Sequence, residues 1–172
     1  MASAPSVEPI DEEVTFSDEG IDARALITRT DRRGIITFAS KAYRNMTKYS
    51  KEELIGKPHS IVRHPDMPEA AFKEMWNTIL SGRRWVGIVK NLRKDGKYYW
   101  VIVKIDPIDK NGNVIEEEPE KIEGFLAIRR EPSKEDIKKA EEYYKVIRKA
   151  ELVEKRKRGV IKKWEEKILN KL

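Results

Sequence analysis

The ten residues HSIVRHPDMP, at positions 59–68, hold the densest group of chemically active side chains in this sequence. Both histidines of the chain, His59 and His64, lie here beside Arg63 and Asp66. Such a group could coordinate a metal, act as an acid–base pair, bind an anion or cap the helix that follows. The choice depends on the spacing of these residues and on the elements that flank them.

The spacing argues against a metal site and against catalysis. The two histidines are five residues apart, whereas a helical pair of metal ligands is four apart. Pro65 prevents a regular helix between them, and no third ligand is apparent. The sequence also lacks a nucleophile–base pair, a glycine-rich phosphate loop and a carboxylate cluster. We therefore predict neither a metal nor an enzymatic activity.

The remaining chemistry is binding of a polar or anionic group at a helix start. Asp66 stands three residues before Glu69, the spacing of a capping box, so Asp66 is expected to hold the turn. The planar guanidinium of Arg63 suits phosphate or carbonyl oxygens. His59 and His64 could donate to the same ligand edge, or they could bond loop carbonyls in a purely structural role. The stretch is thus predicted to be a loop at the edge of a pocket.

Hydrophobic spacing and turn residues define the elements around this loop. Ser50 and Glu53 form a second capping-box pattern, and residues 93–96 form a hairpin turn. The expected strands are residues 25–30, 35–38, 85–92, 98–105 and 124–130, and the expected helices are residues 40–47, 50–56, 68–80 and the chain after Pro132. Helices segregated between the second and third strands predict an α+β domain, with a five-stranded antiparallel sheet and short helices on one side.

The chain divides into three parts by composition. Residues 1–20 are acidic and are expected to be a flexible arm, with some order near Val14. Residues 21–132 form the domain. Residues 133–172 are expected to be an amphipathic helical extension that begins at a Ser133 cap and is interrupted at Gly159. Its apolar stripe comprises Ile137, Ala140, Tyr144 and Ile147, and a second stripe follows the glycine at Ile161, Trp164, Ile168 and Leu172.

Charge and cysteine content limit the possible functions. The net charge is +6, and the extension carries 14 of the 36 basic and 8 of the 30 acidic residues, so the rest holds 22 of each and is neutral. A solvated helix face, a partner protein or an anionic lipid surface would suit this charge, and no nucleic-acid-binding motif accompanies it. The absence of cysteine excludes thiolate metal sites and a flavin–cysteinyl adduct. No apolar run approaches the length of a membrane span.

Two longer runs carry a family resemblance. GKPHSIVRHPDMPEAAFKEMW and WVGIVKNLRKDGKYYWV resemble the sensory PAS domain of the bacterial aerotaxis, or energy-taxis, receptor family, and the similarity extends over about residues 20–165. The resemblance implies a PAS fold that binds FAD without a covalent bond and senses redox state. It also implies signalling to a membrane-anchored HAMP and methyl-accepting module in chemotaxis, and a location in the cytoplasm at the inner face of the membrane through that partner.

The resemblance also assigns roles to individual residues. His59, Arg63, His64 and Asp66 would contact the flavin. Ser40 stands where the family usually has an asparagine, so its shorter hydroxyl would bond either the ligand or a neighbouring loop. On the strand at residues 85–92, Trp85 is the candidate for a contact with the flavin ring, and Asn91 could present both a donor and an acceptor to the flavin edge.

Two other functions compete with a flavin sensor. A PAS module without a cofactor would fill its pocket with side chains and act as a homodimer, and the stripe at Ile137 and Tyr144 favours this. A haem-binding PAS domain would use His59 or His64 as the axial ligand. An absorption spectrum distinguishes the three.

Overall fold

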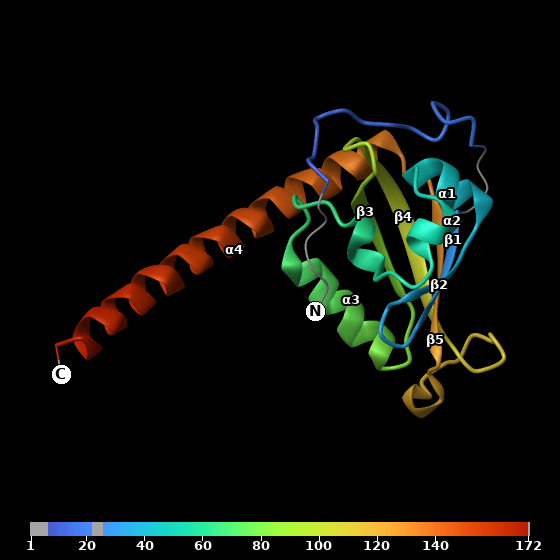
Figure 1. Cartoon of the computed structure of the whole chain (residues 1–172). Coiled ribbons are helices and arrows are strands. Elements are labelled where there is room, and N and C mark those ends of the chain that lie inside the picture. The colour runs from blue at the N-terminus through green and yellow to red at the C-terminus, as the bar shows by residue number, and fades with distance from the viewer. Residues whose placement is uncertain (1–6, 22–25, 172) are drawn as a thin grey trace.

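The computed structural model describes residues 7–21 and 26–171 and contains one antiparallel sheet with the strand order β2-β1-β5-β4-β3 (Figure 1). The strands are β1 (Leu26–Asp31), β2 (Ile36–Ala39), β3 (Trp85–Leu92), β4 (Tyr98–Ile108) and β5 (Gly124–Arg130). The helices are α1 (Lys41–Thr47), α2 (Lys51–Leu54), α3 (Glu69–Leu80) and α4 (Lys134–Leu169), with short 3-10 turns η1 (His59–Val62) and η2 (Pro119–Lys121). This is the predicted α+β arrangement, a PAS fold.

The sequence patterns explain most element boundaries. β3 and β5 have the predicted bounds, and the Ser50–Glu53 capping box forms at the start of α2. β4 runs to Ile108, three residues beyond the predicted end, because residues 106–108 continue to pair with β5. Ala25 and Leu172, which the sequence placed in a strand and in an apolar stripe, lie outside the described residues.

The core lies between the inner face of the sheet and the short helices. α1, α2 and α3 cover one face, as predicted, and Figure 1 shows them in front of the strands. Leu26 from β1, Tyr43 from α1, Leu54 from α2 and Tyr99 from β4 are completely buried there. Burial of apolar side chains on this scale is the main source of stability for a domain of this size.

The described part of the N-terminal arm packs along the β3–β4 hairpin. The Ile10 amide donates to the Gly96 carbonyl at 2.9 Å, and the Val14 amide donates to the Tyr98 carbonyl at 2.8 Å. Val14 and Phe16 are buried in the core. Residues 7–21 are therefore part of the folded unit, whereas the first six residues of the expected arm lie outside the described ones.

α4 is continuous from Lys134 to Leu169, so the predicted interruption at Gly159 is wrong. A glycine costs a helix only about 1 kcal/mol relative to alanine, and the helix-forming residues on both sides outweigh that cost. The predicted Ser133 cap is present. Near its start the helix is held by Tyr144, whose hydroxyl donates to the Ile88 carbonyl at 2.6 Å. From Leu152 onward every described residue is exposed, and Figure 1 shows the helix projecting from the domain.

The predicted capping role of Asp66 is wrong. Pro68 occupies the N-cap position of α3 without a side-chain hydrogen bond, and the Asp66 carboxylate instead accepts from Lys90 at 2.9 Å. The cap comes from α4, because the Glu151 carboxylate accepts from the backbone amides of Glu69 and Ala70, each at 3.0 Å. A residue 82 positions away in sequence thus binds the positive end of the α3 dipole.

Replacing Glu151 with alanine should weaken both α3 and the docking of α4. Loss of a helix N-terminal carboxylate costs roughly 1 kcal/mol, since the two amides lose their acceptor. Urea denaturation would report that loss, and the Glu69 and Ala70 amides should exchange with solvent faster. Glu154→Ala, three residues further along the exposed part of α4, is the matched control. Equal effects of the two substitutions would contradict the capping role.

Candidate functional site

Polar side chains collect in the domain interior where α1, η1 and the inner face of the sheet meet. The His59 ring nitrogen Nε2 lies 2.8 Å from Arg129 Nη2 and 3.1 Å from the Thr28 hydroxyl. The Tyr43 ring meets the His59 ring edge-on, with centroids 6.0 Å apart. Thr28, Tyr43 and Arg129 are all buried. Four elements that are distant in sequence therefore contribute to one polar cluster.

The hydrogen bonds fix the protonation state of His59. An arginine can only donate, so Nε2 must accept the hydrogen bond from Arg129 and the ring proton resides on Nδ1. Burial, and then the nearby Arg129 charge, lower the pKa of His59 to about 3. His59 is therefore neutral at physiological pH and acts here as a hydrogen-bond acceptor.

Two hydroxyl groups in this interior make no well-angled hydrogen bond among the described residues, although they lie close to each other and one of them lies close to Asn91. They are Tyr43 Oη and Tyr99 Oη, and both tyrosines are completely buried. Burial raises the pKa of both phenols, so each hydroxyl keeps its proton and can donate. Buried polar groups are almost always paired, so these hydroxyls form a donor set that the polar edge of a bound molecule would satisfy. A flavin, whose pyrimidine edge carries carbonyl oxygens, fits this donor set.

Trp85 and Asn91 lie on the inner face of β3, since residues six apart in a strand point to the same side. Both are buried, at 8% and 6% exposed. The Trp85 ring rests against the backbone of Gly87, so closely that a Cβ atom at position 87 would lie 2.2 Å from it. Asn91 stands opposite Tyr99 in the β3–β4 register. Asn91 thus adjoins the Tyr99 hydroxyl, whereas Trp85 lies farther along the strand.

The loop that bears Arg63 and His64 crosses the edge of β3 rather than entering the interior as one unit. The backbone of Arg63 pairs with that of Asn91, and its guanidinium stacks on the Phe72 ring at 4.1 Å. The His64 ring accepts the Asp66 amide at Nδ1 and meets Tyr98 edge-on.

Burial, and then the Lys90 charge, lower the pKa of His64 to about 4. The 3.7 Å approach of Asp66 Oδ2 is therefore no ion pair at neutral pH. His59 and Asn91 therefore both lie in the interior, whereas His64 is buried beside Tyr98 and Asp66 is exposed at the edge of β3.

Ser40 has a structural task in this arrangement. Its hydroxyl oxygen accepts from the Ile27 amide at 3.1 Å and from the Tyr43 amide at 3.3 Å, which caps α1 and ties it to β1. By this cap Ser40 orients the helix that presents Tyr43. A direct contact between Ser40 and a cofactor stays a prediction.

Neither histidine is well placed as a haem ligand. His59 Nε2 already accepts from two donors, and His64 Nδ1 accepts a backbone amide. Within residues 7–21 and 26–171, no three acidic or histidine side chains are grouped to hold a metal ion.

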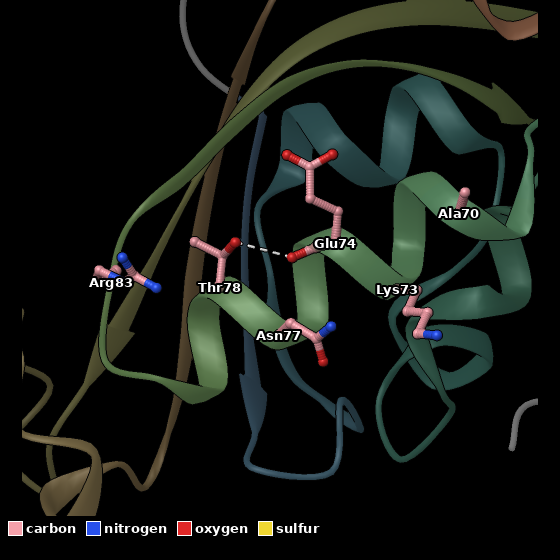
Figure 2. A pocket seen from close by; sticks show the side chains of 6 residues that line it. All are labelled: Ala70, Lys73, Glu74, Asn77, Thr78 and Arg83. Atoms are coloured by element: carbon pink, nitrogen blue, oxygen red, sulfur yellow. Dashed lines mark hydrogen bonds between the residues drawn. The ribbon is translucent and has the colours of Figure 1, made fainter.

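Two surface depressions lie outside the polar interior. Figure 2 shows the first, where Lys73, Glu74 and Arg83 fan out along α3 and the neighbouring loop, with one internal hydrogen bond from Thr78 to the Glu74 carbonyl at 2.9 Å. The second, of about 280 Å³, lies between α4 and β3–β4 and is lined by Trp100 and Tyr144 among others. Neither gathers the predicted site residues, apart from Asp66 at the edge of the second.

Sequence reasoning missed Thr28, Tyr43, Tyr99 and Arg129. Only Arg129 left a usable signal, because it shares the inward face of its strand with Phe125 and Ala127. A charged residue that alternates with two apolar residues on the core face of a strand is rarely buried unless it has a structural partner or binds a ligand.

Comparisons with known proteins agree with this fold. Residues 36–116 match the PAS fold family. The chain is 40% identical over 126 residues to the aerotaxis receptor of Escherichia coli (strain K12), covering 73% of this chain and 23% of the receptor. It is 33% identical over 86 residues to the nitrogen fixation regulatory protein of Klebsiella pneumoniae, covering 50% of this chain and 17% of that protein. The chain therefore spans less than a quarter of the length of these two relatives.

Solved structures give the same architecture. One, named "Flavin Analogue Sheds Light on Light-Oxygen-Voltage Domain Mechanism", superposes with a TM-score of 0.53 at 21% identity and covers 76% of this chain and 88% of that one. Another, the light state of the blue-light photoreceptor Aureochrome1 LOV, gives a TM-score of 0.51 at 18% identity, covering 78% of this chain and 94% of that one. At these identities the likeness concerns the fold alone.

Proposed function

Because the chain contains a PAS domain, we propose that it is an FAD-binding redox sensor that serves aerotaxis. The single observation that carries the proposal is the group of buried polar side chains that Tyr43, Tyr99 and Asn91 form in the domain interior. Its similarity to an aerotaxis receptor and its fold likeness to a domain studied with a flavin analogue support the same conclusion. With no cysteine in the sequence, the flavin would act without a covalent bond to the protein.

The chain's own residues would divide the work of holding the cofactor. Tyr43, Tyr99 and Asn91 would donate to or accept from the polar edge of the ring system, while neutral His59 keeps Arg129 in position. Arg63 at the rim would reach the anionic part of FAD. The flavin supplies electron transfer and a change of charge on reduction. The protein's part is to orient that ring and to transmit its change through α1, β3 and α3.

An absorption spectrum of the purified protein tests the proposal. We expect a yellow protein with flavin bands, and FAD in the heat-released fraction by mass spectrometry. A colourless protein that takes up no flavin from added FAD would defeat the proposal. It would favour a PAS module without a cofactor, an alternative that gains support from the complete burial of Leu26, Tyr43 and Tyr99 by the chain's own packing.

The partner of this sensor would be a methyl-accepting signalling module reached through α4, together with a second copy of the chain. On the face of α4 opposite Tyr144, apolar residues alternate at three- and four-residue spacing over three heptads, interrupted once by Lys157. These residues are Tyr143, Val146, Ala150, Val153, Val160 and Trp164, and all are exposed. We name this set the α4 seam. Such spacing is the signature of a coiled coil, and a single lysine in it specifies register.

The seam favours a parallel pair of identical helices. In a parallel register Lys149 of one chain would face Glu154 of the other, an attractive pair of flanking charges. The stripe at Ile137 and Tyr144, by contrast, faces the chain's own domain, since Tyr144 is bonded to β3. Two signalling domains would then lie side by side at one end of the coiled coil, which suits transmission along α4.

Replacing Val160 with aspartate should break this dimer. A carboxylate in the dry seam of a coiled coil is strongly unfavourable, so we expect the dimer dissociation constant to rise by about a hundredfold or more. Analytical ultracentrifugation over a concentration series measures it. Leu169→Asp is the matched control, because Leu169 is equally exposed on α4 but lies outside the seam. A wild-type chain that stays monomeric at high concentration would contradict the dimer.

A further inference from the structure

One strip along α4 contains only basic residues. An α-helix turns by about 100° per residue, so residues spaced by four and by seven lie along the same side of it. The positions of this strip are Lys138, Lys145, Lys149, Arg156, Lys163 and Lys167, and all six are exposed. We call this set the basic ridge. It runs beside the α4 seam and apart from the side on which Tyr144 bonds to β3.

The protein's own carboxylates leave most of the basic ridge uncompensated. Among the ion pairs of residues 7–21 and 26–171, only one involves a member of the ridge, Lys145, which meets Glu141 at 3.0 Å. Cations on other sides of α4 are paired with carboxylates at N–O distances of 2.8–3.7 Å. These pairs are Lys139–Glu135, Arg148–Glu151, Lys155–Glu69 and Arg158–Glu154. The ridge therefore differs from the rest of the helix surface.

The spacing of charges along the ridge adds repulsion. Lys145 and Lys149 are four residues apart, and so are Lys163 and Lys167. Like charges at this spacing face each other on a helix and destabilise it. The residues three and four positions away from Arg156 are all uncharged, so no carboxylate of α4 can reach that guanidinium. An external anion would relieve this repulsion.

A dimer through the α4 seam would leave the ridge uncompensated as well. In its parallel register, Arg156 and Lys163 of one chain would face isoleucines of the other chain, five positions further along. The projecting part of the helix, residues 152–171, holds 8 basic and 3 acidic residues, a net charge of +5. The whole chain has a net charge of +6, so nearly all of its excess positive charge lies on this part.

The shape of the ridge limits what can bind it. α4 is continuous from Lys134 to Leu169, and Figure 1 shows it as one rod. At about 1.5 Å per residue, the ridge extends over roughly 44 Å from Lys138 to Lys167. A partner that meets all of it must present negative charge along a straight line of that length. The headgroup plane of an anionic bilayer does so, whereas the phosphate strands of a nucleic-acid duplex wind away from a straight rod.

We propose that the basic ridge binds the surface of a membrane that contains anionic phospholipids, with α4 lying along that surface. The long lysine and arginine side chains would reach the lipid phosphates while the helix stays above the headgroups. A group of four to eight basic residues on an amphipathic helix is typical of such binding. The ridge does not involve the domain interior, so this binding is independent of the flavin.

The test is sedimentation of the whole chain with vesicles of phosphatidylcholine, either pure or mixed with about one third phosphatidylglycerol. We expect binding to the anionic vesicles alone, and weaker binding as salt screens the charges. The double variant Arg156→Gln with Lys163→Gln removes two ridge cations from the projecting part. Each cation near an anionic surface contributes about fivefold, so the partition coefficient should fall by about thirtyfold.

The matched control is Arg158→Gln with Lys162→Gln. It removes the same two residue types from the same projecting part and changes the net charge equally, but both positions lie on the far side of α4 from the ridge. Its partition coefficient should stay within about twofold of the wild type, because these charges lie beyond the screening length from the membrane. Glutamine supports a helix well, and circular dichroism checks that α4 is intact in both variants.

Equal losses in the two double variants would show that net charge drives binding, and would overturn the proposal. A wild type that binds neither kind of vesicle, or binds both equally, would also overturn it. A short DNA duplex is the third probe, and ridge-dependent binding to the duplex without binding to vesicles would assign the ridge to nucleic acid instead. A chain that takes up no flavin but binds anionic vesicles through the ridge would defeat the proposed function and support this inference.

Discussion

Replacing Asn91 with leucine is expected to leave the domain folded and to reduce its flavin affinity by about ten- to a hundredfold. Asn91 is 6% exposed on the inner face of β3, opposite Tyr99 in register. Its amide can donate and accept at once, so its loss removes up to two hydrogen bonds to a flavin edge. At roughly 0.5–1.5 kcal/mol for each bond, the loss corresponds to that range in the dissociation constant.

Leucine has the same branched arrangement of side-chain heavy atoms as asparagine, which makes the substitution mainly a test of polarity. FAD titration by fluorescence quenching gives the dissociation constant, and circular dichroism reports the fold. Asn77→Leu is the matched control, since Asn77 is exposed on α3. An Asn91→Leu protein with normal flavin affinity would remove Asn91 from the site. A variant that no longer folds would give Asn91 a structural role instead.

The parts of the fold that local physics determines were predictable from the sequence. The alternation in β3 placed Trp85 and Asn91 on one face, and both are buried there. The Ser50–Glu53 capping box depends on atoms three residues apart and forms as predicted. In each case the competing interactions are local, so residue type and spacing suffice.

The failures involve partners that are remote in sequence. Asp66 has the spacing of a cap, but Lys90 attracts its carboxylate, and Glu151 from α4 occupies the amides that Asp66 would have capped. The spacing pattern cannot rank a local cap against an ion pair that forms only after β3 and α4 are in place. The expected interruption at Gly159 failed for a related reason. The helix-forming residues of the 36-residue helix α4 together outweigh the cost of one glycine.

The candidate site was only half predictable for a related reason. Trp85, Asn91 and His59 were identified from the sequence and lie on the interior side. Their polar neighbours Tyr43 and Arg129 come from α1 and β5, and neither segment alone indicates that these two residues meet. The cluster exists only because β5 inserts between β1 and β4, which brings Arg129 beside Leu26. Sheet order, rather than any motif, assembles the site.

Acid should destabilise the flavin-free protein from about pH 6.5 downward, well above the range in which its carboxylates titrate. His59 has a pKa of about 3 in the folded protein against 6.5 in the unfolded chain. Above pH 6.5 the His59 imidazole is neutral in both the folded and the unfolded protein, so the free energy of unfolding does not depend on its protonation. Below it the unfolded chain binds a proton that the folded protein excludes, so the free energy of unfolding falls by up to about 1.4 kcal/mol for each pH unit.

His64 has a pKa of about 4 in the folded protein, and its side chain is 4% exposed. It should therefore also lower the free energy of unfolding as the pH falls from 6.5 to about 4. Since these are the only two histidines, their substitution isolates the effect. Glutamine can accept the hydrogen bonds from Arg129 and Thr28 but does not titrate, so His59→Gln should remove roughly 2 kcal/mol of the loss in unfolding free energy between pH 7 and pH 5. Urea denaturation at the two pH values gives that difference for each protein, which cancels any uniform destabilisation by the substitution. If His59→Gln loses as much stability between the two pH values as the wild type, His59 is not buried in its neutral form, and the hydrogen bond from Arg129 that organises the interior is not made.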